Sequence, residues 1–135
     1  MNTTELKKLW QHEEKIAHIH GWDFSHLDGR YNSNEDKLPW NYESVVKKYL
    51  RPDMKMLDID TGGGEVLISF KHPYALTSAT EAYPPNVKIC KEILLPLGID
   101  FHESSNYSDL PFDDCEFDIV LNRHGAYDLK EIKEF

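Results

Sequence analysis

The sequence predicts an α/β protein with a parallel β-sheet. Three observations point to this fold class: strand candidates alternate with helical segments, the strands are apolar on both sides, and a glycine-rich turn links the first strand to a helix. Strands of this kind are buried on both faces, as in parallel sheets covered by helices. We predict a single domain in which residues 51–135 form half of a doubly wound fold and residues 1–50 form a helical cap and lid region.

The amino-terminal fifty residues are predicted to form two helices joined by a loop. Thr3 or Thr4 is positioned to cap the first helix, and Gly21 should end it. Apolar residues recur at helical spacing again over residues 42–50, and Pro52 lies just beyond the predicted end of that second helix.

Four strand candidates follow in the second part of the chain. They cover residues 56–59, 74–80, 99–103 and 117–122, and the last is the most apolar. Helical segments separate or follow them, including the first turns of a helix over residues 128–135. This alternation is typical of parallel strands joined by crossover helices.

One of these helices is predicted between the second and third strands. Pro85 suits its first turn, because the N–H that proline lacks is not needed there. Gly98 suits its end. Its predicted buried stripe consists of Val87, Cys90, Leu94 and Leu97.

Composition and charge narrow the classes of function. The 135 residues carry a net charge of −9, which repels phosphate backbones and argues against nucleic acid as a partner. No apolar run approaches the ~20 residues of a membrane-spanning helix, and the polar first eight residues are not a secretory signal, so we expect a cytoplasmic protein without a membrane partner. The two cysteines form no CxxC pair and the seven histidines lack metal-ligand spacing, so no metal site is expected.

A glycine-rich turn follows the first strand, at the place where α/β folds bind their ligands. Three consecutive glycines, residues 62–64, let the backbone approach a ligand closely. A dinucleotide fingerprint requires GxGxxG, but counting from Gly62 a later glycine position is taken by Leu67, which weakens a nicotinamide interpretation. A plain tight turn between strand and helix is the alternative without function.

Two acidic residues lie at the ends of neighbouring strand candidates. Asp58 closes the first strand, where a carboxylate can meet an ammonium group. Glu81 follows the second strand, and an acid there can accept both hydroxyls of a ribose. Tyr83 and Pro84 offer flat surfaces for a planar base. The pattern predicts a nucleoside site.

Three ordered motifs resemble the class I S-adenosylmethionine-dependent methyltransferase family, whose fold is a Rossmann-like doubly wound sheet. The motifs are MLDIDTGGGE at residues 56–65, EAY at residues 81–83, and LPF followed by FDIV within residues 110–120. The resemblance covers roughly residues 40–128. It implies a transferase that uses S-adenosyl-L-methionine as its cofactor.

The resemblance also implies a set of cofactor-binding residues. The first strand and its turn would border the methionine part of the cofactor, and Glu81 would bind the ribose. Residues after the third strand would contact the adenine, and residues after the fourth would face the methionine part and the acceptor. The implied residues are Asp58, Asp60, Thr61, Gly62, Gly63, Gly64, Glu81, Ala82, Tyr83, Asn106, Tyr107, Asn122 and Arg123.

The sequence departs from the family pattern at two positions. Asp60 stands where the family has its first glycine, so either the turn begins differently or the acid adds a contact to the ligand. Asn106 stands where the family has an aspartate, and its amide oxygen can still accept a hydrogen bond from the adenine amine.

The acceptor is expected to be a small molecule. Methyl transfer from a sulfonium is an in-line displacement, for which a protein supplies mainly proximity and alignment. A general base is needed only for a poorly ionised acceptor, and His124 and His26 are the candidates. Family members that methylate amines of bases carry an Asn-Pro-Pro-aromatic motif, whereas residues 122–125 read NRHG.

Aromatic residues of the first part of the chain are candidates for a lid over the cofactor and the acceptor. They can equally anchor the helical cap to the sheet, and both interpretations stay open. The residues are Trp22, Phe24, Trp40 and Tyr42.

The resembled fold has seven strands, whereas four are found here, which predicts a truncated chain. The outer edge of the apolar fourth strand would then be unpaired and open to self-association. The main functional prediction is a small-molecule methyltransferase or its amino-terminal part. A truncated, non-catalytic module that binds a nucleoside or S-adenosylmethionine is the alternative, and a dehydrogenase is the third candidate.

Overall fold

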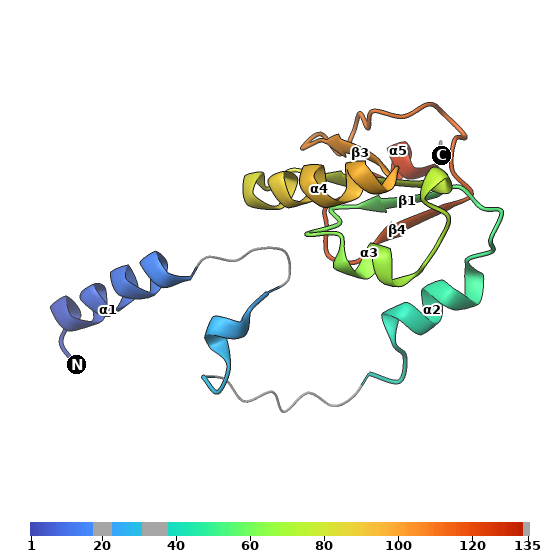
Figure 1. Cartoon of the computed structure of the whole chain (residues 1–135). Coiled ribbons are helices and arrows are strands. Elements are labelled where there is room, and N and C mark those ends of the chain that lie inside the picture. The colour runs from blue at the N-terminus through green and yellow to red at the C-terminus, as the bar shows by residue number, and fades with distance from the viewer. Residues whose placement is uncertain (18–22, 31–37, 134–135) are drawn as a thin grey trace.

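The computed structural model describes residues 1–17, 23–30 and 38–133 (Figure 1). These residues contain one sheet of four parallel strands in the spatial order β3-β2-β1-β4. The chain therefore moves outward from β1 to β3 and then crosses back to the other side of β1, the reversal that defines a doubly wound sheet. The predicted α/β fold class is confirmed. The strands are β1 (Met56–Ile59), β2 (Thr77–Glu81), β3 (Asp100–Glu103) and β4 (Ile119–Asn122).

The register brings the carboxyl ends of the strands together at one edge of the sheet, here called the carboxyl edge. Asp58 of β1 lies opposite Ala79 of β2, and Ile59 lies opposite Asn122 of β4. Glu81 is two residues beyond Ala79, so it lies beside the turn that follows β1. The two carboxylates predicted to share a site thus lie at the same edge, where the strand order reverses. The opposite edge, where the strands begin, is here called the amino edge.

Three helices cover one face of the sheet: α2 (Tyr42–Tyr49), α3 (Glu65–Ser69) and α4 (Pro84–Leu97). Met56 of β1 and Leu94 of α4 are fully buried in the apolar cluster between them. Burying a leucine side chain contributes about 1.5–3 kcal/mol, so contacts of this kind hold the helices on the sheet.

The opposite face carries a second apolar cluster. Because side chains alternate along a strand, the other residues of β1, Leu57 and Ile59, point to this face, where they pack with Phe117. Ile132 of α5 (Leu129–Lys133) packs at its margin. Both faces of the central strand are therefore buried, as its apolar sequence predicts.

The helix α4 is close to its prediction. It begins at Pro84 instead of Pro85, and the chain turns after it at Gly98, whose φ of +90° is left-handed. The predicted stripe is buried at three positions, Val87, Cys90 and Leu94. Leu97 is 37% exposed, because the helix ends there and Ile99, just after the turn, enters the core instead.

Three strands begin later than predicted. Residues 74–76 form a 3₁₀ turn, η2 (Tyr74–Leu76), so β2 begins at Thr77. This turn follows Pro73, whose carbonyl accepts hydrogen bonds from the Leu76 N–H and the Thr77 hydroxyl. The third strand starts one residue and the fourth two residues after the predicted positions.

The first helix, α1 (Thr3–Ile16), is capped differently from its prediction. The Asn2 side chain accepts a hydrogen bond from the Glu5 N–H at 2.9 Å, and the Glu5 carboxylate accepts one from the Asn2 N–H at 2.9 Å. This reciprocal capping box makes Asn2 the cap in place of Thr3 or Thr4.

The carboxyl-terminal end of α1 and its surroundings also differ from the prediction. The helix ends at Ile16, whereas the predicted end, Gly21, lies outside the described residues. No residue of α1 is buried, and Figure 1 shows the helix apart from the sheet. The assignment of residues 1–50 to a cap stays a prediction. Neither α1 nor any other helix of the described residues is long and apolar enough to cross a membrane.

Candidate functional site

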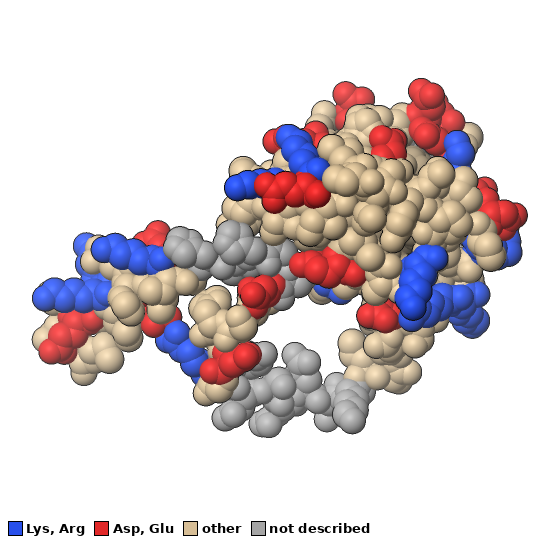
Figure 2. Space-filling view, viewed as in Figure 1, with Lys and Arg blue, Asp and Glu red and all other residues tan. Residues whose placement is uncertain are grey.

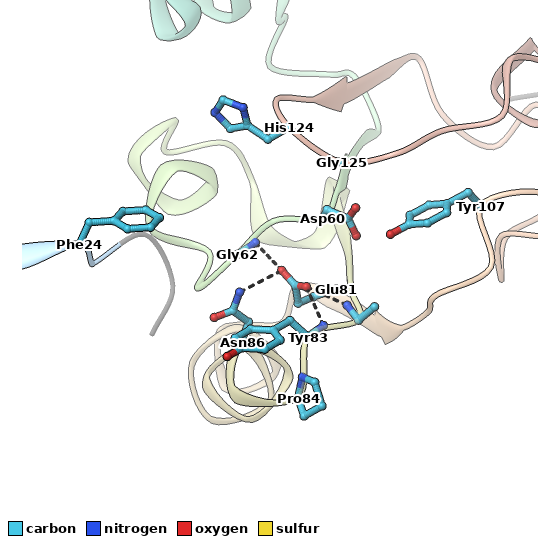
Figure 3. Close-up of a pocket in the computed structure, with 11 residues that line it drawn as sticks. Phe24, Asp60, Gly62, Glu81, Tyr83, Pro84, Asn86, Tyr107, His124 and Gly125 are labelled. Carbon is cyan, nitrogen blue, oxygen red and sulfur yellow. Dashed lines mark hydrogen bonds between the residues drawn. The ribbon is translucent and has the colours of Figure 1, made fainter. Parts of the chain in front are cut away.

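A cleft of about 530 Å³ opens at the carboxyl edge (Figure 3). Its walls come from the ends of β1 and β2, the first turn of α4, the loop after β3 and the segment after β4. Residues from far apart in the sequence therefore meet there because parallel strands end at one edge. The lining residues are Phe24, Asp60, Gly62, Glu81, Ala82, Tyr83, Pro84, Asn86, Tyr107, His124 and Gly125.

The Glu81 carboxylate lies at the centre of a hydrogen-bond network in this cleft (Figure 3). Its Oε2 atom accepts a hydrogen bond from the Gly62 N–H at 2.8 Å, and its Oε1 atom accepts from the N–H groups of Ala82 and Tyr83 at 2.8 and 2.9 Å. The Asn86 side chain donates a longer bond of 3.4 Å. Although Glu81 is only 6% exposed, these donors hold its charge and tie the tip of β2 to the turn after β1.

The glycine turn is held from both sides. The Gly62 N–H is bound by Glu81, while its carbonyl accepts a hydrogen bond from the Cys90 thiol at 3.1 Å. Burial, together with nearby carboxylates such as Glu81, raises the pKa of Cys90 to about 12, so the thiol keeps the proton that it donates. Sequence reasoning placed Cys90 in the core but missed this contact.

Only one of the three predicted glycines lines the cleft. Gly62 does so, with a left-handed φ of +69°. Gly64 faces α4 instead: a Cβ atom there would lie 2.7 Å from the Leu94 Cδ2 atom. Gly63 lies against the Glu65 side chain, 2.5 Å from Oε1 if it carried a Cβ atom. These two glycines let the turn pack closely, and Gly62 is the one of the three that lines the cleft.

Asp58 lies beside the cleft and not in it. It is 7% exposed and borders a smaller hollow that Tyr42, Thr61 and Arg123 also line. Burial raises the pKa of Asp58 to about 6, although the Thr61 hydroxyl and the charge of Arg123 oppose this shift. Burial and the neighbouring Asp58 also raise the pKa of Tyr42 to about 12.

Asp60, the first residue after β1, lines the cleft together with Glu81. Its φ of +54° is left-handed, and the Tyr107 hydroxyl is directed toward its carboxylate (Figure 3). The Oδ1 atom is buried and has no hydrogen-bond partner among the described residues. Burial and the charge of Glu81 raise the pKa of Asp60.

Only some of the residues predicted to contact adenine and methionine line the cleft. Tyr107 lines the cleft, whereas Asn106 is exposed and its side chain accepts a hydrogen bond from the Ser108 N–H. Asn122 donates to the Ala126 carbonyl at 3.4 Å and does not line the cleft. Arg123 turns toward α2, with its guanidinium 5.8 Å from the centre of the Tyr42 ring.

The four aromatic lid candidates are not gathered over the cleft. Phe24 lines it and is 39% exposed. Trp40 is 56% exposed away from it, and Tyr42 packs near Phe70, with ring centres 6.3 Å apart. Trp22 lies outside the described residues.

The two histidines considered as general bases also differ in position. His124 lines the cleft on the side of β4 (Figure 3), whereas His26 does not line it. The roles of both histidines stay predictions.

Two lining residues, Asn86 and Gly125, were missed by sequence reasoning. Asn86 lies four residues before the buried Cys90 on the same face of α4, so helical spacing alone places it inward. Gly125 has no such signal: a Cβ atom there would collide with the Asp60 carboxylate, which only the folded chain reveals.

No protein-family model and no curated protein matches this chain. Among solved structures, the YcgJ protein from Bacillus subtilis is similar, with 22% identity over 61% of this chain and 37% of that one and a TM-score of 0.48. A SAM-dependent methyltransferase from Thermotoga maritima, described as a possible histamine N-methyltransferase, is 24% identical over 59% of this chain and 34% of its own, with a TM-score of 0.41. The chain thus matches about a third of the length of each.

Proposed function

We propose that this chain binds S-adenosylmethionine in the cleft at the carboxyl edge and serves methyl transfer to a small-molecule acceptor. One observation carries the proposal: the Glu81 carboxylate and the Gly62 backbone meet at 2.8 Å at the carboxyl edge, beside the strand from which the chain order runs in both directions. This arrangement joins a ribose-binding acid to a bare turn along which a ligand can lie. The volume of about 530 Å³ lies within the range of small-molecule sites.

The nucleoside would occupy the end of the cleft formed by β2 and α4. The 3.4 Å contact from Asn86 is the longest of the bonds to Glu81, so a ribose hydroxyl can replace it at little cost. Tyr83, which is 50% exposed, and Pro84 offer flat surfaces for the base. The fit thus rests on one weakly held acceptor position of Glu81 and on the open apolar surface beside it.

The chemistry supplied by the bound cofactor is a methyl group on a positively charged sulfur. In the transfer, a lone pair of the acceptor forms the new bond to carbon, and the electron pair of the broken carbon–sulfur bond stays on sulfur. The protein's part is alignment, an effect worth about 7–11 kcal/mol when the geometry is good. His124 on the β4 side is placed to take a proton from an acceptor that needs a base.

Calorimetry with S-adenosylmethionine, S-adenosylhomocysteine, adenosine and NAD tests the binding. We expect the adenosine-containing sulfur ligands to bind and Glu81→Gln to weaken them at least about tenfold, because the amide loses a charge-assisted acceptor. Glu103→Gln is the matched control, since Glu103 lies opposite Glu81 on β3 but is exposed and pairs with Lys91 at 2.8 Å. Equal losses in both variants, or no binding by the wild type, would contradict the proposal.

Transfer itself is measured by release of labelled methyl groups to panels of small amines, thiols and phenols. Binding without transfer to any acceptor would favour the non-catalytic module over the enzyme.

A further inference from the structure

Asp60 keeps a side chain at a position where the backbone favours glycine. Its φ of +54° lies in the left-handed region that residues with a side chain rarely adopt. The same turn places glycines at residues 62 and 64, both also left-handed. Aspartate is one of the few residues with a side chain that adopts this conformation, and glycine would fit it with less strain.

The surroundings of the Asp60 side chain are shaped to accommodate it. The Tyr107 hydroxyl is directed toward it on one side (Figure 3), and on the other a Cβ atom at Gly125 would collide with the carboxylate. Its Oδ1 atom is buried without a hydrogen-bond partner among the described residues. A buried acceptor that lacks a partner costs free energy, so a positive charge brought near this carboxylate from the cleft offsets that cost.

Asp60 lies in the middle of the cleft. Figure 3 shows it between Glu81, at the nucleoside end, and Gly125, on the side of β4. Among the described residues that line the cleft there is no lysine or arginine, whereas Asp60 and Glu81 are both acidic. The middle of the cleft is therefore a place that favours a cation.

In a sulfonium nucleoside, the positive charge would lie next to the part of the cleft that favours a cation. If the base lies near Tyr83 and the ribose at Glu81, the sulfur beyond the ribose would be directed toward Asp60 and the β4 side of the cleft. S-Adenosylhomocysteine has the same shape apart from one methyl group and lacks the charge on sulfur. The two ligands therefore differ at the point that Asp60 faces.

We propose that Asp60 is a specificity-determining residue that makes the cleft prefer the charged S-adenosylmethionine over the neutral S-adenosylhomocysteine. The inference rests on the proposed function. Its consequence is that methyl transfer weakens the binding of the product, since the positive charge that Asp60 attracts is removed in the same step. Release of the product is then helped by the chemistry itself.

Calorimetry at pH 8 with four ligands tests the inference: S-adenosylmethionine, S-adenosylhomocysteine, adenosine, and sinefungin, in which an amine-bearing carbon replaces the sulfonium. We expect the wild type to bind the two cationic analogues at least about tenfold more tightly than S-adenosylhomocysteine, which corresponds to about 1.4 kcal/mol. In Asp60→Asn, of nearly the same shape, the ratio should fall toward one while the affinity for adenosine stays the same. Glu103→Gln should keep the wild-type ratio.

The outcomes separate the inference from the function beneath it. If S-adenosylmethionine and S-adenosylhomocysteine bind equally to the wild type, or if Asp60→Asn keeps the preference, the inference is overturned while the cofactor site stands. If neither these ligands nor adenosine bind, the proposed function fails and the inference with it. Asp60→Gly, which suits the left-handed backbone, should lose the preference like Asp60→Asn, and its thermal unfolding excludes a folding defect as the cause.

Discussion

The two edges of the sheet hold their charged residues in opposite ways. At the carboxyl edge, Asp58 and Glu81 are 7% and 6% exposed, and backbone amides hold the Glu81 carboxylate. At the amino edge, Lys47, Arg51 and Lys71 surround a hollow of about 180 Å³, and all three are exposed. Figure 2 shows basic side chains gathered over α2, on this side of the molecule. Burying a charge costs free energy unless the charge is paired or hydrogen-bonded. The buried carboxylates of the carboxyl edge therefore lower the stability of the fold in a way that the exposed charges of the amino edge do not.

Three described residues other than glycine lie in the left-handed region, and two of them, one at each edge, sharpen the contrast. Asp60 and Lys71 share a φ of +54°. The Asp60 side chain is enclosed by Tyr107 and Gly125, whereas the Lys71 side chain is exposed. A left-handed backbone thus coincides with an enclosed side chain at the carboxyl edge and with an exposed turn residue at the amino edge.

The largest expected effect is a loss of stability on substituting one of two left-handed glycines, which lie at different edges of the sheet. Gly64→Ala should destabilise the protein by about 4 kcal/mol, because strain at φ +84° adds to a collision 2.7 Å from Leu94. Gly98→Ala, at φ +90° before β3, should cost only about 1 kcal/mol, since nothing lies within 4 Å of its Cβ position. Urea unfolding of both variants measures the difference. Equal losses would mean that packing at the carboxyl edge is no tighter than at the amino edge.

A smaller effect is expected from the buried charge of Asp58. Burial raises its pKa from 3.8 to about 6, so the folded state takes up the proton first as the pH falls. Above pH 6 the carboxylate is ionised in both states and the cost of burying it is fully present, on the order of 3 kcal/mol. As the pH falls from 6 to 4 this cost disappears, and below 4 both states are protonated.

Asp58→Asn should therefore gain stability relative to the wild type as the pH rises from 4 to 7, by on the order of 3 kcal/mol. Urea unfolding at several pH values measures this, and taking the difference between the two proteins removes the contributions of other groups. Asp53→Asn at the amino edge, where the aspartate is exposed, should leave the difference flat. A flat difference for Asp58→Asn as well would remove the contrast between the edges.

The smallest effect concerns the two strained residues. Lys71→Gly should stabilise the protein by about 0.5–1 kcal/mol, because the relief of left-handed strain exceeds the entropy that glycine loses on folding. It should leave the affinity for S-adenosylmethionine unchanged, in contrast to the substitutions at Asp60. Thermal unfolding and calorimetry check the two halves of this prediction. A loss of affinity in Lys71→Gly would mean that the amino edge also serves the ligand.

Much of the sheet could be predicted from the sequence. The strand β1 is confirmed at both ends, since its apolar run is short and the glycine turn ends it. The start of β2 was wrong because Pro73 begins a 3₁₀ turn that resembles an apolar strand in sequence. Local periodicity cannot tell these apart without the hydrogen bonds that only the folded chain makes.

The cleft was less predictable than the strands beneath it. The sequence placed Glu81 and Gly62 correctly at one edge, because parallel strands end together. It could not show that Arg123 turns toward Tyr42, nor that Gly125 makes room for Asp60, since both depend on contacts between distant segments. Alternation along β1 was the available signal that Asp58 points to the α2 face.

The bond from the Gly62 N–H to Glu81 allows amide hydrogen exchange to report on changes in the cleft. Most amides of the sheet are protected from deuterium exchange by carbonyl groups of neighbouring strands, but this one is protected by a titratable side chain at 2.8 Å. Any molecule that draws the carboxylate away changes the exchange rate of this amide and of the Ala82 and Tyr83 amides that the same carboxylate binds. Binding at the rim of the sheet can thereby be followed at three backbone positions without a known reaction.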